Sequence, residues 1–209
     1  AGSEAPAADA ADSADAGAAG ETAAASAAGE TAAASVDGSA TKADPGGATA
    51  VAAARSPDAV AAKGGGGDII TRSTYEQFDF RFEWKVAKGA NSGVKYFIIR
   101  ERGSLGHEYQ VIDDINHPDG VRGNHQTASF YDVLAPSKDK PLKPVGEFNT
   151  SRILVKGQTV KHFLNGKVVL TYELGSDEVK AAVAKSKFRK LEKFGVRLAG
   201  HILLQDHGD

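Results

Sequence analysis

Residues 77–86 alternate strictly between large apolar and polar side chains, and this pattern limits the possible folds more than any other feature of the chain. Asp, Arg, Glu and Lys separate the apolar residues, which are Phe78, Phe80, Phe82, Trp84 and Val86. Alternation with a period of two residues is typical of a β-strand that buries one face. The sequence therefore predicts a strand here, with its apolar side chains directed into a core.

Seven further short runs are rich in β-branched and aromatic residues, at 94–100, 107–113, 128–134, 152–156, 159–164, 167–173 and 200–206. Asn165-Gly166 separates two of them and favours a type I′ hairpin, because both central residues of that turn need a positive φ. Only residues 176–194 predict a helix, with Ser176 as its N-cap and Gly195 at its end. Many short strands and one late helix indicate an all-β fold, an antiparallel β-sandwich with one short helix near the C-terminus.

Residues 1–67 differ from the rest of the chain. They contain 28 alanines and no Leu, Ile, Phe, Tyr or Trp, so they lack the large side chains that a core requires. The octapeptide Ala-Gly-Glu-Thr-Ala-Ala-Ala-Ser occurs at 19–26 and again at 28–35. Two interpretations stay open: a low-complexity linker, or a segment that stands in for the first strands of the sandwich. The folding unit is expected at residues 68–209.

Charge and composition argue against several classes of protein. The net charge of −2 divides into −6 for residues 1–67 and +4 for residues 68–209, and the bases form no stripe that would suit nucleic acid. No apolar run approaches the roughly 18 residues of a membrane span. The chain has no cysteine, hence no disulfide or thiolate metal site, and it has no His-Glu-x-x-His zinc motif. We therefore expect neither a nucleic-acid partner nor a membrane span.

Polar residues on one predicted strand form the most informative candidate site. Glu108 and Gln110 share a face of this strand, and a β-bulge would bring Asp113 to the same face. Two carboxylates and an amide on an exposed sheet face suit sugar binding or acid–base chemistry, although a solvated polar face explains the pattern equally well. Gln205 and His207 share a face at the end of the last strand and could point into the same groove.

The remaining candidates also have structural explanations. Arg100 ends a predicted strand, where it could hold a carboxylate or a sugar hydroxyl. His117 precedes Pro-Asp-Gly, which favours a turn, and Asn91 lies in another turn-forming stretch. His162 shares a strand face with two apolar residues, which favours a packed histidine over a catalytic one.

Several blocks of the sequence resemble the 3-keto-disaccharide hydrolase domain family. In chain order they are Phe82-Glu83-Trp84-Lys85, Gly89-Ala90-Asn91-Ser92-Gly93-Val94, Glu108-Tyr109-Gln110-Val111-Ile112-Asp113, His117-Pro118-Asp119, Tyr131-Asp132, and the stretches 146–150, 160–166 and 200–208. The resemblance covers about residues 67–209 and implies a concanavalin A-like jelly-roll sandwich. Residues 1–67 lack the aromatic-rich early strands of that family, and the chain stops before its last strand, so the domain is expected to lack that strand.

The resemblance also implies a chemistry. The family acts on glycosides oxidised at C3, where the ketone acidifies the C2 hydrogen, so a base can remove it, the C1 substituent can leave and water can add back. Such a site needs a base, an acid, and a donor or metal ion for the enolate. In the matching blocks the catalytic candidates are Glu108, Asp113, His117 and His162. The candidates for binding the sugar are Glu83, Asn91, Arg100, Gln110, Tyr131, Gln205 and His207.

By the same resemblance we expect a periplasmic or extracellular protein whose partner is a small carbohydrate or glycoside. A divalent metal ion is a possible cofactor, and no organic cofactor is expected. The fold also hosts non-catalytic lectin-like modules, so a carbohydrate-binding module is an alternative function. The unusual N-terminal segment leaves open a structural subunit of an oligomer or larger assembly.

Overall fold

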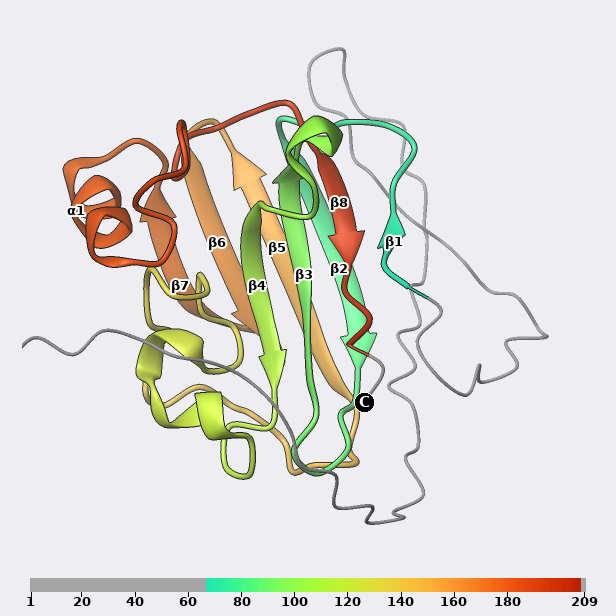
Figure 1. Cartoon of the computed structure of the whole chain (residues 1–209). Helices are drawn as coiled ribbons and strands as arrows, with labels where there is room; N and C mark the ends of the chain where they lie inside the picture. The colour runs from blue at the N-terminus through green and yellow to red at the C-terminus, as the bar shows by residue number, and fades with distance from the viewer. Residues whose placement is uncertain (1–66, 208–209) are drawn as a thin grey trace, which may run out of the picture.

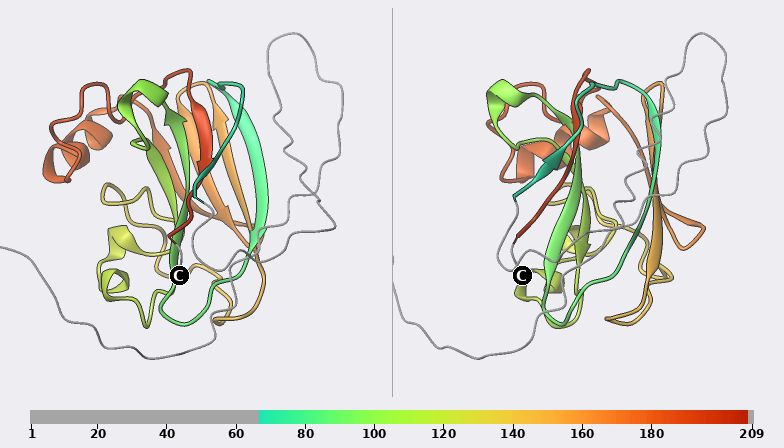
Figure 2. Two further views of the ribbon diagram at one scale, coloured as in Figure 1. Left: turned by 45° about the vertical axis from the view of Figure 1, so that its right-hand side comes forward. Right: turned by 90° about the vertical axis from the view of Figure 1, so that its right-hand side faces the viewer.

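The computed structural model describes residues 67–207, in which two four-stranded antiparallel sheets form a sandwich (Figure 1). The first sheet has the order β1-β8-β3-β4, and the second has the order β2-β5-β6-β7. Edge-on, the sheets form two separate layers (Figure 2). The strands are β1 (Ile69–Ile70), β2 (Phe78–Trp84), β3 (Asn91–Ile98), β4 (His107–Ile112), β5 (Asn149–Lys156), β6 (Thr159–Leu164), β7 (Lys167–Glu173) and β8 (His201–Leu204).

This architecture confirms the all-β jelly-roll sandwich expected from the sequence. The single α-helix of the described residues is α1 (Asp177–Lys185), and three short 3-10 helices lie in loops: η1 (Arg100–Arg102), η2 (Pro118–Val121) and η3 (Gly123–His125). The two interpretations of the N-terminal segment fall on residues outside the described part, apart from Gly67. None of the helices in residues 67–207 has the length and apolar character needed to cross a membrane.

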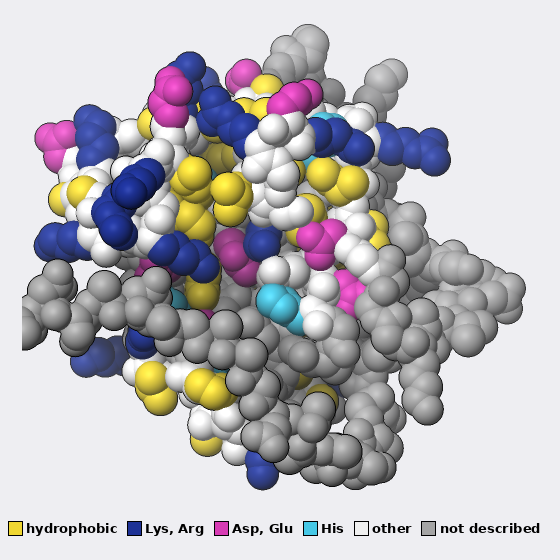
Figure 3. All heavy atoms as spheres, viewed as in Figure 1, with side chains coloured by type: hydrophobic (Ala, Val, Ile, Leu, Met, Phe, Trp, Pro, Cys, Tyr) yellow, Lys and Arg dark blue, Asp and Glu magenta, His cyan; other side chains and the backbone are white. Residues whose placement is uncertain are grey.

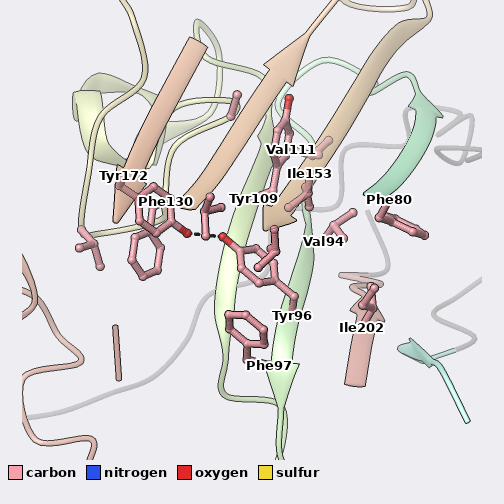
Figure 4. Packing of buried hydrophobic residues seen from close by; sticks show 14 of the residues in the cluster. Phe80, Val94, Tyr96, Phe97, Tyr109, Val111, Phe130, Ile153, Tyr172 and Ile202 are labelled. Carbon is pink, nitrogen blue, oxygen red and sulfur yellow. Dashed lines mark hydrogen bonds between the residues drawn. The ribbon is translucent and has the colours of Figure 1, made fainter. Parts of the chain in front are cut away.

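The core lies between the sheets, where alternate side chains of each strand meet (Figure 4). The aromatic residues predicted to face inward from β2 are all buried. From the first sheet, Tyr96 and Tyr109 reach toward the second sheet, and the Tyr96 hydroxyl is hydrogen-bonded to that of Tyr172 (Figure 4). Phe97 has a φ of 59°, and this irregularity lets two consecutive aromatic residues of β3 join the core.

Turn chemistry places β6 against β7 as predicted. Leu164 pairs with Lys167 across the two-residue turn, and both Asn165 and Gly166 have a positive φ, at 46° and 83°. This pair of conformations is the type I′ turn, whose twist matches that of the flanking strands. The hairpin prediction is therefore confirmed.

Two predicted elements differ from the structure. The helix begins after Ser176 as expected but ends at Lys185, because the Ser186 hydroxyl donates to the Val183 carbonyl and accepts from the Phe188 N–H. The run 128–134 is no strand, since Phe130 makes only isolated bridges to Tyr109 and Leu134. Positive φ values within this run, at Ala128 and Asp132, prevent an extended ladder.

Candidate active site

Strand β4 sends alternate side chains to opposite faces of the first sheet. Tyr109 points toward the second sheet, where its hydroxyl lies 2.8 Å from Ser151 Oγ and donates to the Phe163 carbonyl at 3.0 Å. Glu108 and Gln110 therefore lie on the outer face of the first sheet, the face directed away from the second. Acidic, basic and histidine side chains gather over the middle of this face (Figure 3).

The nearest polar neighbours of the Glu108 carboxylate are Lys95 and two side-chain amides. Lys95 is its direct cross-strand neighbour. The amides of Gln110 and Gln205 each lie 3.2 Å from Glu108 Oε1 when their NH2 groups point toward this oxygen, the orientation that satisfies their hydrogen bonds. In that orientation the Gln205 oxygen accepts from Lys95 Nζ at 3.0 Å. Glu108 is held firmly in this environment, and only 7% of the residue is exposed.

Gly93 provides the space that the Glu108 side chain occupies. Gly93 pairs with Gln110 across the β3–β4 ladder, so a side chain at Gly93 would project onto the same outer face. A Cβ atom built at this position would overlap with Glu108 Oε1. Glycine inside a strand commonly marks a close approach of this kind.

Burial raises the pKa of Glu108 to about 7, because removing the carboxylate from water outweighs the attraction of Lys95, Lys187 and His125. The charge of Asp68 adds to the rise. A carboxyl group with a pKa close to neutrality can both take up and return a proton at physiological pH. This property makes Glu108 the strongest candidate for a catalytic group on this face.

Tyr131 extends the outer face beyond the edge of β4. Its backbone N–H donates to the Glu108 carbonyl at 3.1 Å, and the preceding Phe130 stacks on Tyr172 in the core, so the Tyr131 side chain lies on the outer side. The Tyr131 hydroxyl donates to Asp119 Oδ2 at 2.9 Å. Lys187 Nζ lies 4.2 Å from the centre of the Tyr131 ring, a cation–π distance.

A chain of polar contacts fixes this rim. His125 is buried between Asp119 Oδ1 at 3.1 Å and Asp132 Oδ1 at 2.8 Å. The other oxygen of Asp132 accepts from the Lys187 backbone N–H at 2.7 Å. The segment that follows α1 is therefore attached to the loop that carries Tyr131.

The end of β8 supplies the opposite side of the site. The Gln205 N–H donates to the Gly93 carbonyl at 2.9 Å, and its own carbonyl accepts from Ser92 Oγ at 2.8 Å. His207 Nε2 lies 2.8 and 3.2 Å from the two atoms of the Gln205 amide. The Asn91 side-chain amide lies 3.2 Å from that of Gln110. The site thus offers several hydrogen-bonding groups around one buried acid.

The profile of the 3-keto-alpha-glucoside-1,2-lyase-like domain family matches residues 21–209 of the chain. The chain belongs to this family. A curated relative, a 3-keto-disaccharide hydrolase from Bacteroides thetaiotaomicron, is 35% identical over 176 residues. The match includes 71% of the present chain, and it spans only about 60% of the length of that relative.

Two crystal structures from Parabacteroides distasonis share the fold, and both proteins are described provisionally as glycosyl hydrolases. One is 30% identical with a TM-score of 0.62 and aligns over 68% of this chain and 70% of the other. The second is 26% identical with a TM-score of 0.57 and aligns over 68% of this chain and 77% of the other. Sequence blocks and three-dimensional structure thus agree on the family.

Six of the sequence-predicted residues lie together on the outer face of the first sheet in this member of the family. They are Asn91, Glu108, Gln110, Tyr131, Gln205 and His207. They come from three parts of the chain, namely β3 with β4, the loop at Tyr131 and the end of β8, so this convergence carries more information than a face shared by neighbours on one strand.

Asp113 and His117 have local structural partners instead. The Asp113 carboxylate accepts four hydrogen bonds, from the backbone N–H groups of Gly89, Ile115 and Asn116 and from the Asn116 amide. Burial opposes ionisation, but these hydrogen bonds outweigh it and hold the pKa of Asp113 below its usual range. His117 Nδ1 accepts from the Asp119 N–H and caps η2. Both residues order the loop beyond β4.

His162 lies in the core, on the other side of the first sheet from Glu108. Its Nδ1 lies 3.0 Å from the Ala128 carbonyl, and its Nε2 lies 3.0 Å from the Tyr96 hydroxyl. Burial lowers the pKa of His162 to about 4, so the ring is neutral at pH 7. The Nδ1 proton then donates to the carbonyl while Nε2 accepts from the tyrosine, and both nitrogens are satisfied.

Arg100 and Glu83 lie away from the Glu108 carboxylate. Arg100 follows the far end of β3, where it donates to His201 Nε2 and to the Thr71 carbonyl, both at 3.3 Å. Glu83 lies on the solvent side of β2 in the second sheet. The structure therefore does not bring either side chain to the outer face around Glu108.

Three residues of the site were missed by sequence reasoning: Lys95, Lys187 and the space-providing Gly93. Lys95 shares a strand face with Gly93, and its position opposite Glu108 depends on the register between β3 and β4. Lys187 follows α1 and reaches the site only through the fold. Strand alternation together with the correct pairing register of β3 and β4 would have identified Lys95. No local sequence pattern identifies Lys187.

The donor set around Glu108 does not suit a divalent cation. Nowhere in residues 67–207 do three or more His, Asp or Glu side chains group as metal ligands. The neighbours of Glu108 are an ammonium group and two amide NH2 groups, which compete with a cation for the carboxylate. The reaction proposed below therefore includes no metal-dependent step.

Proposed function

We propose that the chain cleaves 3-keto-glycosides on the outer face of the first sheet, with Glu108 as the base that removes the C2 proton. The observation that carries this proposal is the buried Glu108 carboxylate, whose pKa is raised to about 7 on a face rich in hydrogen-bonding groups. Membership of the 3-keto-alpha-glucoside-1,2-lyase-like family supports the substrate class.

The proposed reaction has two halves. Glu108 takes the C2 proton, and the electron pair of the C–H bond delocalises onto the C3 carbonyl oxygen as an enolate. The enolate then collapses to a C1–C2 double bond as the C1–O bond breaks, and the departing oxygen takes the proton held by Glu108. Water adds across the double bond, with its oxygen at C1 and its hydrogen at C2, which releases the 3-keto sugar. A carboxyl group with a pKa near 7 suits both the uptake and the return of the proton.

Lys95 is placed to stabilise the enolate. Its ammonium group belongs to the residue directly opposite Glu108, so a sugar whose C2 meets Glu108 would hold the neighbouring C3 oxygen within the reach of a lysine. A fixed positive charge in a site shielded from water lowers the energy of a developing oxyanion. Gln110, Gln205, His207, Asn91 and Tyr131 provide hydrogen-bonding groups for the sugar hydroxyls.

The decisive experiment is the Glu108→Gln variant, which keeps the size and polarity of the side chain and removes the base. Removal of a general base typically lowers the rate by about 10²- to 10⁴-fold. We expect such a loss of turnover on a 3-keto-glucoside, with binding of the substrate retained in isothermal titration calorimetry. Glu178→Gln, on the exposed surface of α1, is the matched control and should keep wild-type turnover.

Two results would contradict the proposal. Full turnover by Glu108→Gln would remove Glu108 from the chemistry. A wild-type protein that binds the unoxidised glucoside and releases no alcohol from either compound would be a lectin-like binding module instead.

A further inference from the structure

A cavity with a volume of about 350 Å³ lies at the start of β4, beside the proposed site. Its walls come from the end of β3, from η1 and the start of β4, and from the segment that follows α1. Cavities of this size are typical of small-molecule sites.

Two observations place the cavity next to Glu108. Gly106 and His107 line the cavity, and they are the two residues that precede Glu108 in the chain, within about 7 Å of it along the strand direction. Lys187 contacts the Tyr131 ring at the site, and residues 190–194 of the same segment line the cavity. In Figure 3, apolar side chains gather directly above the acidic and basic groups at the centre of the outer face.

The inner lining of the cavity is mostly hydrocarbon, and its buried polar side chain is that of His107, whose Nδ1 has no hydrogen-bond partner within residues 67–207. Phe97 is buried, and Ile99, Leu105, Phe194 and Leu198 provide further hydrocarbon surface. The charged members of the lining, which are Arg102, Lys190, Glu192 and Lys193, are all exposed to solvent and belong to the rim. His107 can pair with one hydroxyl of a second sugar placed in this cavity, but the other hydroxyls turned toward the hydrocarbon walls would have no partner, which is costly.

We propose that this cavity binds the leaving group of the substrate and selects an apolar ring, alicyclic or aromatic, over a second sugar. The inference rests on the proposed function, because only a sugar bound at Glu108 would direct its C1 substituent into the neighbouring cavity. The substrate class is then 3-keto-glucosides of apolar alcohols. Apolar selectivity of this kind depends on the walls and not on the groups that perform the chemistry.

The test compares cyclohexyl 3-keto-glucoside with a 3-keto-glucosyl-glucose disaccharide. Both compounds release ordinary alcohols, so their intrinsic reactivity is similar while the polarity of the leaving group differs. We expect the wild-type kcat/KM to favour the cyclohexyl compound by about 10-fold or more. In Leu105→Gln this preference should fall by about 10-fold, mainly through KM for the cyclohexyl compound. Leu105 is 48% exposed, so this substitution leaves the core intact.

Val168→Gln is the matched control, because Val168 is an apolar residue on the second sheet with a similar exposure of 42%. It should keep the wild-type preference. A second readout does not depend on turnover: free cyclohexanol should shift the methyl resonances of Leu105 and Leu198 in NMR spectra, and Leu105→Gln should weaken this binding.

The outcomes separate the two proposals. Turnover of both compounds without a cyclohexyl preference, or with a preference that Leu105→Gln leaves unchanged, overturns the leaving-group cavity and leaves the proposed reaction standing. Absence of cyclohexanol binding to the cavity also overturns the inference. If neither compound is turned over, the proposed function is overturned, and the proposed role of the cavity in binding the leaving group is lost with it.

Discussion

At the scale of single residues, the site depends on a buried acid and on the missing side chain that makes room for it. Glu108 lies on an outer sheet face, where acids are normally solvated, yet it is 7% exposed. Its carboxylate occupies the position that a Cβ of Gly93 would take. Because Gly93 has no side chain, it leaves the space in which the Glu108 carboxylate lies.

Gly93→Ala is expected to disturb Glu108 directly. The added methyl group must displace the carboxylate from its two amide partners, so turnover of a 3-keto-glucoside should fall by at least about 10-fold, and overpacking should cost about 1–3 kcal/mol of stability. The double variant Gly93→Ala/Glu108→Ala should recover stability relative to Gly93→Ala, because the conflict disappears. Thermal melts and steady-state kinetics measure both effects.

Gly123→Ala serves as the control for this substitution. A Cβ at Gly123 would meet only Ala135 Cβ, at 3.6 Å, which is an ordinary van der Waals contact. If Gly93→Ala behaves like Gly123→Ala in both assays, the close approach of Glu108 to β3 has no energetic consequence.

At the scale of elements, the sequence predicted strands well where one face is apolar and turns are chemically marked. The bounds of β6 and β7 coincide with the predicted runs, because Asn165-Gly166 fixes their register. The predicted helix was too long, because Phe188 and Phe194 continue the apolar pattern of the helix. In the structure these two residues lie beyond the helix, and their rings stack with centres 4.3 Å apart. A periodic pattern does not distinguish a helix from a packed loop of this kind.

Asp113→Asn tests the order of the loop beyond β4. The wild-type carboxylate accepts four hydrogen bonds, and an amide has one acceptor oxygen instead of two, so we expect a loss of about 1–3 kcal/mol at pH 7. The folded-state pKa of Asp113 is depressed, so this stabilisation is present at neutral pH and is lost as the pH falls below its ordinary value of 3.8.

The difference in melting temperature between wild type and Asp113→Asn should therefore be largest near pH 7 and should shrink toward pH 3. Asp177→Asn, at an exposed position of α1, should change stability by less than about 0.5 kcal/mol. A constant difference across this pH range would show that ionised Asp113 does not hold the loop.

At the scale of the whole molecule, buried titratable groups make the free energy of unfolding depend on pH. Ionisation of Glu108 lowers it at alkaline pH, and protonation of two histidines lowers it at acid pH. Burial raises the pKa of Glu108 to about 7, so stability from its protonated form is present below pH 4.5 and is lost as the pH rises through 7. Burial lowers the pKa of His107 to about 3 and that of His162 to about 4. Stability from these neutral rings is present above pH 6.5 and is lost as the pH falls.

Glu108→Gln should consequently be more stable than wild type at pH 8, by about 3 kcal/mol at most, and the gain should disappear toward pH 4.5. On the acid side both proteins should lose stability together, because the histidines are unchanged. Differential scanning calorimetry of both proteins between pH 4 and 9 measures this. If the stability of the two proteins changes with pH in the same way above pH 7, burial of the ionised Glu108 carboxylate does not destabilise the protein.

The candidate site was predicted less completely than the fold. Glu108, Gln110, Gln205 and His207 could be proposed from strand faces and family blocks, because alternation decides which side chains share a face. Lys95 required the register of two strands, and Lys187 required the path of the chain after α1. Contacts between segments far apart in sequence leave no local pattern, so only the three-dimensional structure placed them.

The cavity and the acid belong to different parts of the molecule. Glu108 is anchored in a strand whose neighbours are fixed by ladder hydrogen bonds, whereas much of the cavity wall comes from residues 190–198, outside both sheets. Laboratory evolution could therefore vary the exposed cavity residues Lys190, Glu192 and Lys193 while Glu108 and its sheet are kept unchanged. Exchanging these residues between relatives would then change the cavity wall without altering the sheet that carries Glu108.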